Sequence, residues 1–279
     1  MDIPFIHLGD SGLPVHFLHA NGYPPECYRP LLEKLTSHYQ VFAMRQRPLW
    51  QGSQPKEIAD WRPLTDDFLR YLDVQATSPT VAIGHSVGGI VALRAALHQP
   101  ERFQALVLID PVLFPPLVIR LWWLIHALGL VYQIHPLVRA TRGRRSQFDD
   151  LERLFVGYRR KPVFRYMDDH ALHAYVEGIA CPIEKGYQLC FSSDWEARIY
   201  GTSVWPDMDI WRGLAGLKVP LLIIRGEETD TFWASTGQRV QRKLPGARIL
   251  SVPRSTHLVP LERPQEVSEI IMSFLKEIL

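Results

Sequence analysis

The sequence contains little cysteine and no surplus of charge. Cys27, Cys181 and Cys190 are the only cysteines among 279 residues, and none of them has CxxC spacing. An odd number without such spacing predicts neither a disulfide framework nor a zinc site, and it is typical of a reducing compartment. The formal net charge is only +2. Because a phosphate-binding surface usually makes a domain clearly basic, this balance argues against nucleic acid as the main partner.

The pattern of a signal peptide is also missing from the first twelve residues. They contain no basic stretch followed by an apolar one, so no signal peptide is predicted and we expect a cytoplasmic protein. A long apolar run occurs later, at residues 113–134, but Pro115, Pro116, Arg120 and His126 interrupt it. A charge near the centre of a membrane span costs about 2.5 to 3.5 kcal/mol on insertion scales. The run therefore predicts helices that cover a pocket, with an interfacial membrane contact as the second interpretation.

Apolar runs and helical patterns alternate through most of the chain. Turn residues between the first two apolar runs predict a hairpin of residues 3–8 and 15–18. Further strands are expected at residues 41–44, 80–83, 105–109, 219–224 and 248–252, and helices at residues 28–39, 61–72, 87–97, 237–244 and 265–279. Strands with almost no polar residue must be covered on both faces, which indicates a mostly parallel central sheet between two helix layers.

This alternation stops in the middle of the chain. Residues 111–212 are rich in Trp, Tyr, Arg and His, and prolines divide them into short helical stretches. We therefore predict an α/β core made of residues 1–110 and 213–279, interrupted by a helical cap at residues 111–212. The length of 279 residues suits one large domain with such an insertion.

A serine framed by glycines follows the predicted strand at residues 80–83. The pentapeptide Gly84-His85-Ser86-Val87-Gly88 matches the pattern G-x-S-x-G between a buried strand and a helix. A sharp strand-to-helix bend would raise the hydroxyl of Ser86 at the carboxyl edge of the sheet, and side chains at positions 84 and 88 would collide with it. Ser86 is therefore the predicted nucleophile.

A serine nucleophile needs a base and an acid from elsewhere in the chain. His257 lies in a short loop after the strand at residues 248–252, and it is the predicted base. The strand at residues 219–224 leads into Glu227, Glu228 and Asp230, so we expect the acid there. Asp230 is preferred because Gly226 and Thr229 suggest a turn that returns it to the strand end, and Glu227 is the alternative.

The oxyanion donors are expected from two backbone positions. One donor is the N–H of Val87, the first residue of the helix that follows the serine. The other is the N–H of Asn21, in the loop of small residues after the strand at residues 15–18.

These segments together resemble the α/β-hydrolase family. The resemblance rests on the loop at residues 19–22, the serine pentapeptide, Leu-Ile-Asp-Pro at residues 108–111, residues 226–230 and residues 256–264. The chain order Ser86, Asp230, His257 is the order that the family uses. Dehalogenases and epoxide hydrolases of the family have an aspartate at the nucleophile position, so Ser86 argues against both.

Two departures from the family pattern concern the shape of the pocket. Ala20 replaces a glycine of many relatives, and Gln46-Arg47-Pro48 stands where relatives often read Arg-Gly-His. In relatives that carry a cap, this insertion covers the active site. We therefore expect Trp122, Trp123, Phe155 and Tyr158 to contact a small to medium hydrophobic substrate.

The predicted activity is hydrolysis of a carboxylic ester, without a cofactor or a metal. Hydrolysis of a carbon–carbon, thioester or amide bond uses the same residues and stays open. So does a small-molecule receptor with little turnover. The sequence leaves the oligomeric state undetermined.

Overall fold

The computed structural model describes residues 3–75, 77 and 79–279, and no side-chain placement is described for Arg142. Seven strands form the central sheet in the order β1-β3-β2-β4-β5-β9-β10. They are β1 (Phe5–Leu8), β2 (Leu13–Leu18), β3 (Tyr39–Met44), β4 (Thr80–His85), β5 (Phe103–Ile109), β9 (Leu221–Gly226) and β10 (Arg248–Val252). β1 is antiparallel to β3, and every other pairing in this sheet is parallel. The predicted mostly parallel α/β sheet is therefore confirmed.

The predicted hairpin of the first two strands is wrong. β3 lies between β1 and β2 and pairs with both. The turn residues at positions 9–12 reverse the chain as expected, but the helix that follows β2 returns β3 to the gap between the two strands. Local turn chemistry predicts a change of direction, whereas strand pairing depends on segments farther along the chain.

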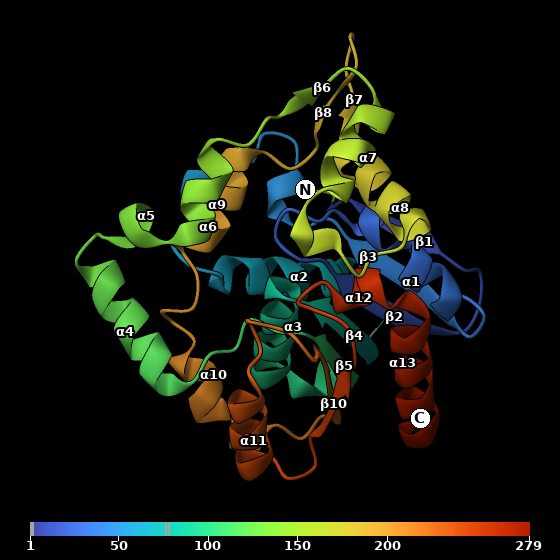
Figure 1. Cartoon of the computed structure of the whole chain (residues 1–279). Helices are drawn as coiled ribbons and strands as arrows, with labels where there is room; N and C mark the ends of the chain where they lie inside the picture. The colour runs from blue at the N-terminus through green and yellow to red at the C-terminus, as the bar shows by residue number, and fades with distance from the viewer. Residues whose placement is uncertain (1–2, 76, 78) are drawn as a thin grey trace.

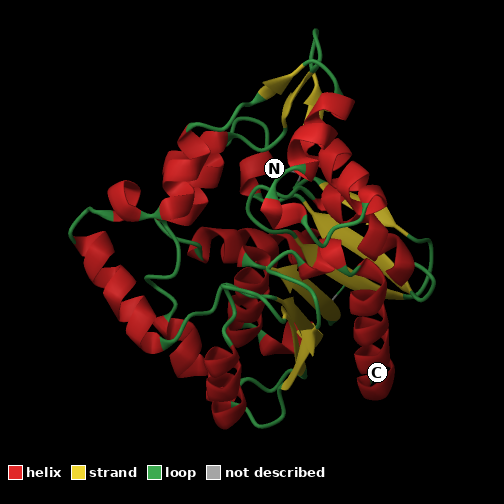
Figure 2. Cartoon of the chain, in the orientation of Figure 1, coloured by secondary structure: helices red, strands yellow, loops and turns green. Residues whose placement is uncertain are grey.

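Helices cover both faces of this sheet (Figures 1 and 2). Those outside the region between β5 and β9 are α1 (Arg29–Leu35), α2 (Arg62–Gln75), α3 (Val87–His98), α11 (Ala234–Lys243), α12 (Val259–Glu262) and α13 (Pro264–Ile278). α2 and α3 pack on one face, together with Leu106 and Leu108 of β5. α1 and α13 pack on the opposite face, together with Ala105 and Val107 of the same strand. The strand side chains alternate between two buried clusters, as the period of two requires.

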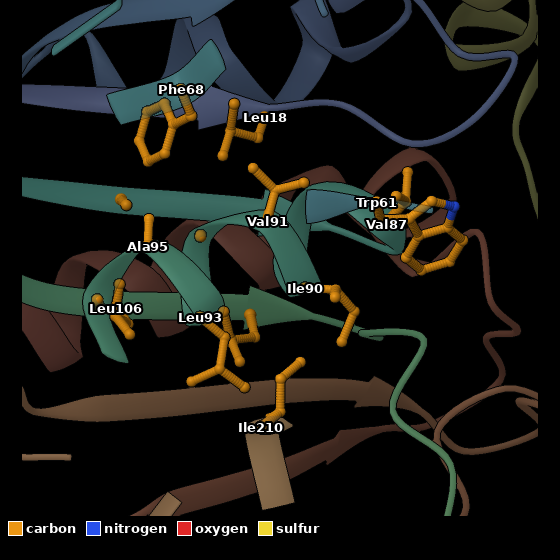
Figure 3. Packing of buried hydrophobic residues seen from close by; sticks show 14 of the residues in the cluster. Leu18, Trp61, Phe68, Val87, Ile90, Val91, Leu93, Ala95, Leu106 and Ile210 are labelled. Atoms are coloured by element: carbon orange, nitrogen blue, oxygen red, sulfur yellow. The ribbon is translucent and has the colours of Figure 1, made fainter. Parts of the chain in front are cut away.

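α3 is almost completely enclosed by other elements. Figure 3 shows Ile90, Val91 and Leu93 of α3 among side chains from several other elements, including Phe68 of α2 and Ile210. All ten residues from Val87 to Ala96 are buried. Because protein interiors are close-packed, this helix gives the residue before it a firmly fixed position. That residue is Ser86.

We use the term cap segment for residues 111–212, which lie between β5 and β9. Its helices are α4 (Pro116–Ala127), α5 (Val131–Ile134), α6 (Pro136–Arg142), α7 (Leu151–Arg159), α8 (Asp169–Ile179), α9 (Ser193–Gly201) and α10 (Met208–Gly213), the last of which ends one residue beyond it. Side-chain oxygens of Asp150, Asp168 and Ser192 accept N–H groups at the starts of α7, α8 and α9. Among the described residues, no helix has the length and apolar character needed to cross a bilayer.

The cap segment also contains a small sheet that the sequence analysis did not predict. β6 (Gln147–Phe148), β8 (Tyr187–Leu189) and β7 (Ala180–Pro182) pair in this order, all antiparallel. A disulfide joins Cys181 to Cys190 across it, and Cys27 is free and buried. The expectation of no disulfide is therefore wrong. The cysteine content consequently gives no support for a reducing compartment.

Candidate functional site

Ser86 occupies a strained bend between β4 and α3. Its φ is 58° and its ψ is −120°, outside the regions that most residues adopt. A Cβ atom at position 84 would lie 2.4 Å from the carbonyl oxygen of Gly88, and a Cβ atom at position 88 would lie 2.3 Å from the carbonyl oxygen of Leu18. Both distances are far below van der Waals contact, so only glycine fits at these positions, as predicted from the pentapeptide.

His257 lies beside Ser86 although 171 positions separate them in the sequence. The loop after β10 carries His257, and α3 begins after β4, so both residues are placed at the carboxyl ends of parallel strands. The Oγ atom of Ser86 is 3.0 Å from Nε2 of His257. Ser86 is 6% exposed, whereas the side chain of His257 is 26% exposed. The serine is thus enclosed by protein, and the imidazole lies partly open above it.

The carboxylate behind the imidazole belongs to Asp110. Its Oδ2 atom is 2.6 Å from Nδ1 of His257, and its side chain is fully buried. A carboxylate can only accept there, so Nδ1 of the neutral imidazole carries the proton and Nε2 is left to accept from the serine hydroxyl. Asp110 follows β5 directly and has a φ of 41°. This left-handed turn directs its side chain toward His257 instead of along the strand.

The prediction of Asp230 as the acid is therefore corrected. Asp230 is exposed, and its Oδ1 atom accepts a hydrogen bond from the hydroxyl of its neighbour Thr231. Glu227, the alternative, is also exposed and accepts from the N–H of Arg254. The loop after β9 does not contain the carboxylate that contacts His257, but it donates hydrogen bonds to that carboxylate. Thr229 Oγ1 donates to Asp110 Oδ2 at 2.5 Å, and the N–H of Gly226 donates to Asp110 Oδ1 at 3.3 Å.

Exposed polar contacts join the residue before Thr229 to the cap segment. The guanidinium of Arg165 donates to Glu228 Oε2 at 2.7 Å, and the hydroxyl of Tyr166 donates to Glu228 Oε1 at 2.6 Å. The loop after β9 therefore contacts the acid on one side and the cap segment on the other.

Asn21 and Val87, the residue that follows Ser86, line one cavity. Val87 begins α3, where backbone N–H groups point away from the helix without intrahelical partners. Within the described part of the chain, no acceptor is found for the backbone N–H of either residue. The two residues predicted to supply the oxyanion N–H groups thus line the same cavity, and their role stays a prediction. The side-chain amide of Asn21 donates to the carbonyl oxygen of Glu196 in α9 at 3.0 Å, which attaches this loop to the cap segment.

Two buried histidines fix the loops around the serine. Nδ1 of His19 donates to the carbonyl oxygen of Ala20 at 2.8 Å, and the N–H of Gln46 donates to its Nε2 at 3.1 Å. This arrangement needs a neutral ring, and burial lowers the pKa of His19 to about 4. His19 therefore holds the loop of Asn21 in place.

His85 connects three loops through a chain of hydrogen bonds. The N–H of Ala20 donates to the hydroxyl of Tyr28 at 3.1 Å, and that hydroxyl lies 2.7 Å from Nδ1 of His85. Nε2 of His85 lies 2.8 Å from the carbonyl oxygen of His257. Because this carbonyl can only accept, Nε2 carries the proton and the Tyr28 hydroxyl donates to Nδ1. Burial, with the nearby His257, holds the pKa of His85 well below its usual value.

None of the four predicted substrate-contacting aromatic residues is found in the lining of the cavity at Val87. Trp122 lies against the ring of His135, and Phe155 stacks on His173. Trp123 is 54% exposed. Tyr158 is buried, but it accepts a hydrogen bond from Arg144 and packs on Phe164 and Tyr175. Trp122, Phe155 and Tyr158 thus pack against other side chains of the cap segment, and Trp123 faces water.

Other residues surround the cavity. Its volume is about 10 Å³, roughly that of one water-sized sphere. The lining residues are His19, Ala20, Asn21, Gln46, Pro48, Leu64, Val87, Phe191 and Ile199. Phe191 and Ile199 come from the cap segment, and the Oε1 atom of Gln46 is buried without a hydrogen-bond partner among the described residues. Gln46 and Pro48 lie in the segment where the sequence departs from the family pattern. That departure is the one sequence feature that points to these two residues as part of the site.

Comparisons with known proteins agree with the fold. A family model described as the alpha/beta hydrolase family matches residues 17–270. The uncharacterized hydrolase YugF of Bacillus subtilis is 24% identical over 253 residues, covering 89% of this chain and 85% of the relative. The 2-(acetamidomethylene)succinate hydrolase of Mesorhizobium japonicum is 21% identical over 273 residues, covering 95% and 88%. A solved structure of E-2-(acetamidomethylene)succinate hydrolase superposes with a TM-score of 0.77 at 19% identity, covering 97% of this chain and 93% of that one.

Proposed function

The chain belongs to the α/β hydrolase family, and on this premise we propose that it hydrolyses carboxylic esters with Ser86, His257 and Asp110 as its catalytic residues. One observation carries the proposal. A serine hydroxyl, an imidazole and a buried carboxylate form one hydrogen-bonded chain, at 3.0 and 2.6 Å, at the carboxyl edge of the sheet. Such a chain activates a weak nucleophile and holds the base in the required tautomer.

The reaction proceeds in two halves. Ser86 Oγ attacks the ester carbonyl while His257 Nε2 takes its proton, and Asp110 stabilises the resulting imidazolium. The carbonyl oxygen becomes negative and accepts from the N–H groups of Val87 and Asn21. The carbon–oxygen bond then breaks, and His257 returns the proton to the leaving alcohol. A water molecule, deprotonated by His257, attacks the acyl-serine and releases the acid and the free serine hydroxyl.

The cavity beside the oxyanion donors favours a short, largely apolar acyl group. Pro48, Leu64, Phe191 and Ile199 contribute apolar surface, and the volume of about 10 Å³ leaves little room in this conformation. Turnover of nitrophenyl esters should therefore decrease from acetate to butyrate to octanoate. A small hydrophobic ester fits this site best, without a cofactor or a metal.

Amide hydrolysis is a second candidate that one observation favours. The buried Oε1 atom of Gln46 lacks a hydrogen-bond donor among the described residues, and a buried acceptor without a partner costs about 1 to 3 kcal/mol. An amide substrate brings an N–H group that an ester lacks. The relative from Mesorhizobium japonicum is named for a substrate with an acetamido group. The nitroanilide and the nitrophenyl ester of acetate, compared at equal concentration, distinguish the two reactions.

A fluorophosphonate probe tests the proposed nucleophile directly. The wild type should be labelled covalently and should turn over nitrophenyl acetate, whereas Ser86→Ala should lose both properties. Ser235→Ala is the matched control, because Ser235 is an exposed serine on α11. Tight binding of a small molecule without labelling or turnover in the wild type would contradict the proposal and favour a receptor. Thioesters and diketones in the same panel test the remaining bond types.

A further inference from the structure

The outer part of the cap segment exposes a dense group of large apolar side chains. Of the fifteen large hydrophobic residues that are exposed among the described residues, eight lie between positions 117 and 137. They are Leu117, Leu121, Trp123, Leu124, Leu128, Leu130, Ile134 and Leu137, with exposed fractions between 41% and 78%. We call these eight residues the apolar face. Isolated exposed apolar residues are normal, but a contiguous group marks an interaction surface.

The apolar face follows the geometry of α4. Leu117, Leu121, Leu124 and Leu128 recur at intervals of three and four residues, so they form one stripe along the helix. The buried residue of this helix, Ile119, lies on the opposite side. Figure 1 shows α4 along the outer edge of the molecule, far from α13. The helix therefore packs on the protein through its other face and directs the leucine stripe to water.

The charged side chains within residues 111–148 have one sign, although one of them, Arg144, pairs with Glu196 of α9. Residues 111–148 contain five arginines and no aspartate or glutamate, although the whole chain has 29 acidic residues. Arg120 lies within α4 and Arg139 within α6, and both are exposed. A helix with a leucine stripe on one side and an arginine beside it is typical of a segment that lies in the interface of an anionic membrane.

We propose that the apolar face binds the surface of an anionic lipid bilayer, with Leu117, Leu121 and Leu124 inserted and Arg120 and Arg139 near the headgroups. α4 has 12 residues and is about 18 Å long, shorter than the roughly 30 Å hydrocarbon core, so it lies on the bilayer and does not cross it. A second copy of the chain fits less well. In a two-fold interface the same surface meets itself, which would place arginines near arginines without a carboxylate from this segment.

Co-sedimentation of the full chain with vesicles tests the lipid proposal. The wild type should sediment with vesicles of phosphatidylglycerol and phosphatidylcholine at low salt, and much less with phosphatidylcholine alone. The triple variant Leu117→Ser, Leu121→Ser, Leu124→Ser should lose on the order of tenfold or more in partitioning. Arg120→Gln with Arg139→Gln should lose roughly thirtyfold on anionic vesicles, since each surface arginine contributes about 1 kcal/mol.

A matched control removes exposed apolar residues elsewhere. Val74, Leu250 and Leu279 are 66%, 45% and 56% exposed and lie outside the cap segment. Their triple serine variant should partition within about twofold of the wild type. Circular dichroism and thermal melting should show that all variants fold.

Two outcomes overturn the lipid proposal. One is wild-type protein that stays in the supernatant with anionic vesicles, and the other is an unchanged bound fraction in the leucine triple variant. Light scattering identifies the competing occupant. A wild-type dimer without lipid that becomes a monomer in the triple variant, together with absent vesicle binding, assigns the apolar face to a second copy.

Discussion

The core and the cap segment treat their polar and apolar side chains in opposite ways. In the core, the carboxylate of Asp110 is fully enclosed and still accepts hydrogen bonds from His257, Thr229 and Gly226. The cap segment instead leaves large apolar side chains in water, with Leu117 as much as 78% exposed. Buried polar groups that are hydrogen-bonded favour a single rigid arrangement of the site. A group of exposed apolar side chains is instead typical of a surface that binds another molecule. In the two proposals, the core therefore carries the catalytic residues, and the cap segment carries the surface that binds lipid.

The strongest test of the core concerns the acid. Asp110→Asn should lower kcat/KM on the order of 10⁴-fold, because an amide no longer fixes the tautomer of His257 or stabilises its protonated form. Asp230→Asn should stay within about twofold of the wild type, since Asp230 is exposed and contacts Thr231. Steady-state kinetics with nitrophenyl acetate measures both, with thermal melting as the control for folding. A larger loss for Asp230→Asn would return the acid to the loop after β9.

The hydrogen-bond chain beneath the serine gives the next largest effect. Tyr28→Phe removes the hydroxyl that accepts from Ala20 and donates to His85, leaving buried groups unpaired. The free energy of unfolding should fall by about 1 to 3 kcal/mol, and kcat should fall more than KM changes.

Tyr71→Phe is the matched control for this variant. The Tyr71 hydroxyl is buried and has no hydrogen-bond partner among the described residues. Its removal should leave the free energy of unfolding unchanged or raise it. Urea unfolding of both variants measures the difference, and equal losses would refute a positioning role for the hydrogen-bond chain.

Acid should weaken the core through its buried neutral histidines. The folded-state pKa of His19 is lowered from 6.5 to about 4, so between these values the unfolded chain binds a proton that the folded chain does not. The free energy of unfolding should therefore fall as pH drops from 6.5 toward 4, by up to about 1.4 kcal/mol per pH unit from this residue.

His19→Gln should reduce that slope, because the proton-binding group is gone. Chemical unfolding at several pH values measures it, and the exposed His170→Gln should follow the wild-type curve. An unchanged slope in His19→Gln would show that another group governs the acid response.

The smallest effect is expected in the cap segment. Trp123→Ala should change kcat/KM on nitrophenyl acetate by less than about twofold, because the Trp123 side chain is 54% exposed and lies outside the lining of the cavity at Val87. Phe191→Ala is the informative partner, since it enlarges the cavity and should raise turnover of the butyrate ester relative to acetate. A large loss in Trp123→Ala would place the substrate under α4.

Much of the core could be predicted from the sequence, because its signals are local. Buried strands lack polar residues. The glycines around Ser86 mark a tight bend, at which an added Cβ atom would lie only 2.3 or 2.4 Å from a backbone carbonyl oxygen. His257 was found through its place after a strand. The position of β3 between β1 and β2 was missed, since pairing is decided by distant segments.

The acid was missed for a related reason. β5 and β9 are neighbours in the sheet, so a carboxylate at the end of either strand could reach His257. The left-handed backbone turn at Asp110 and the hydrogen bond from the hydroxyl of Thr229 favour Asp110 over the carboxylates that follow β9. Neither feature can be predicted from the residue types alone. In the cap segment, residue type alone does not show which aromatic side chains face a substrate. Trp122 and Phe155 lie against the histidine rings of His135 and His173, and Trp123 is exposed.

Glu228 and Thr229 are consecutive, and each is bound to a different part of the protein. Glu228 accepts from Arg165 and Tyr166 of the cap segment, while Thr229 donates to Asp110. Two adjacent residues thus connect the cap segment to the carboxylate of Asp110, which holds the imidazole of His257 in place. The cap segment and the aspartate behind the imidazole are therefore separated by no more than two consecutive residues of the loop after β9.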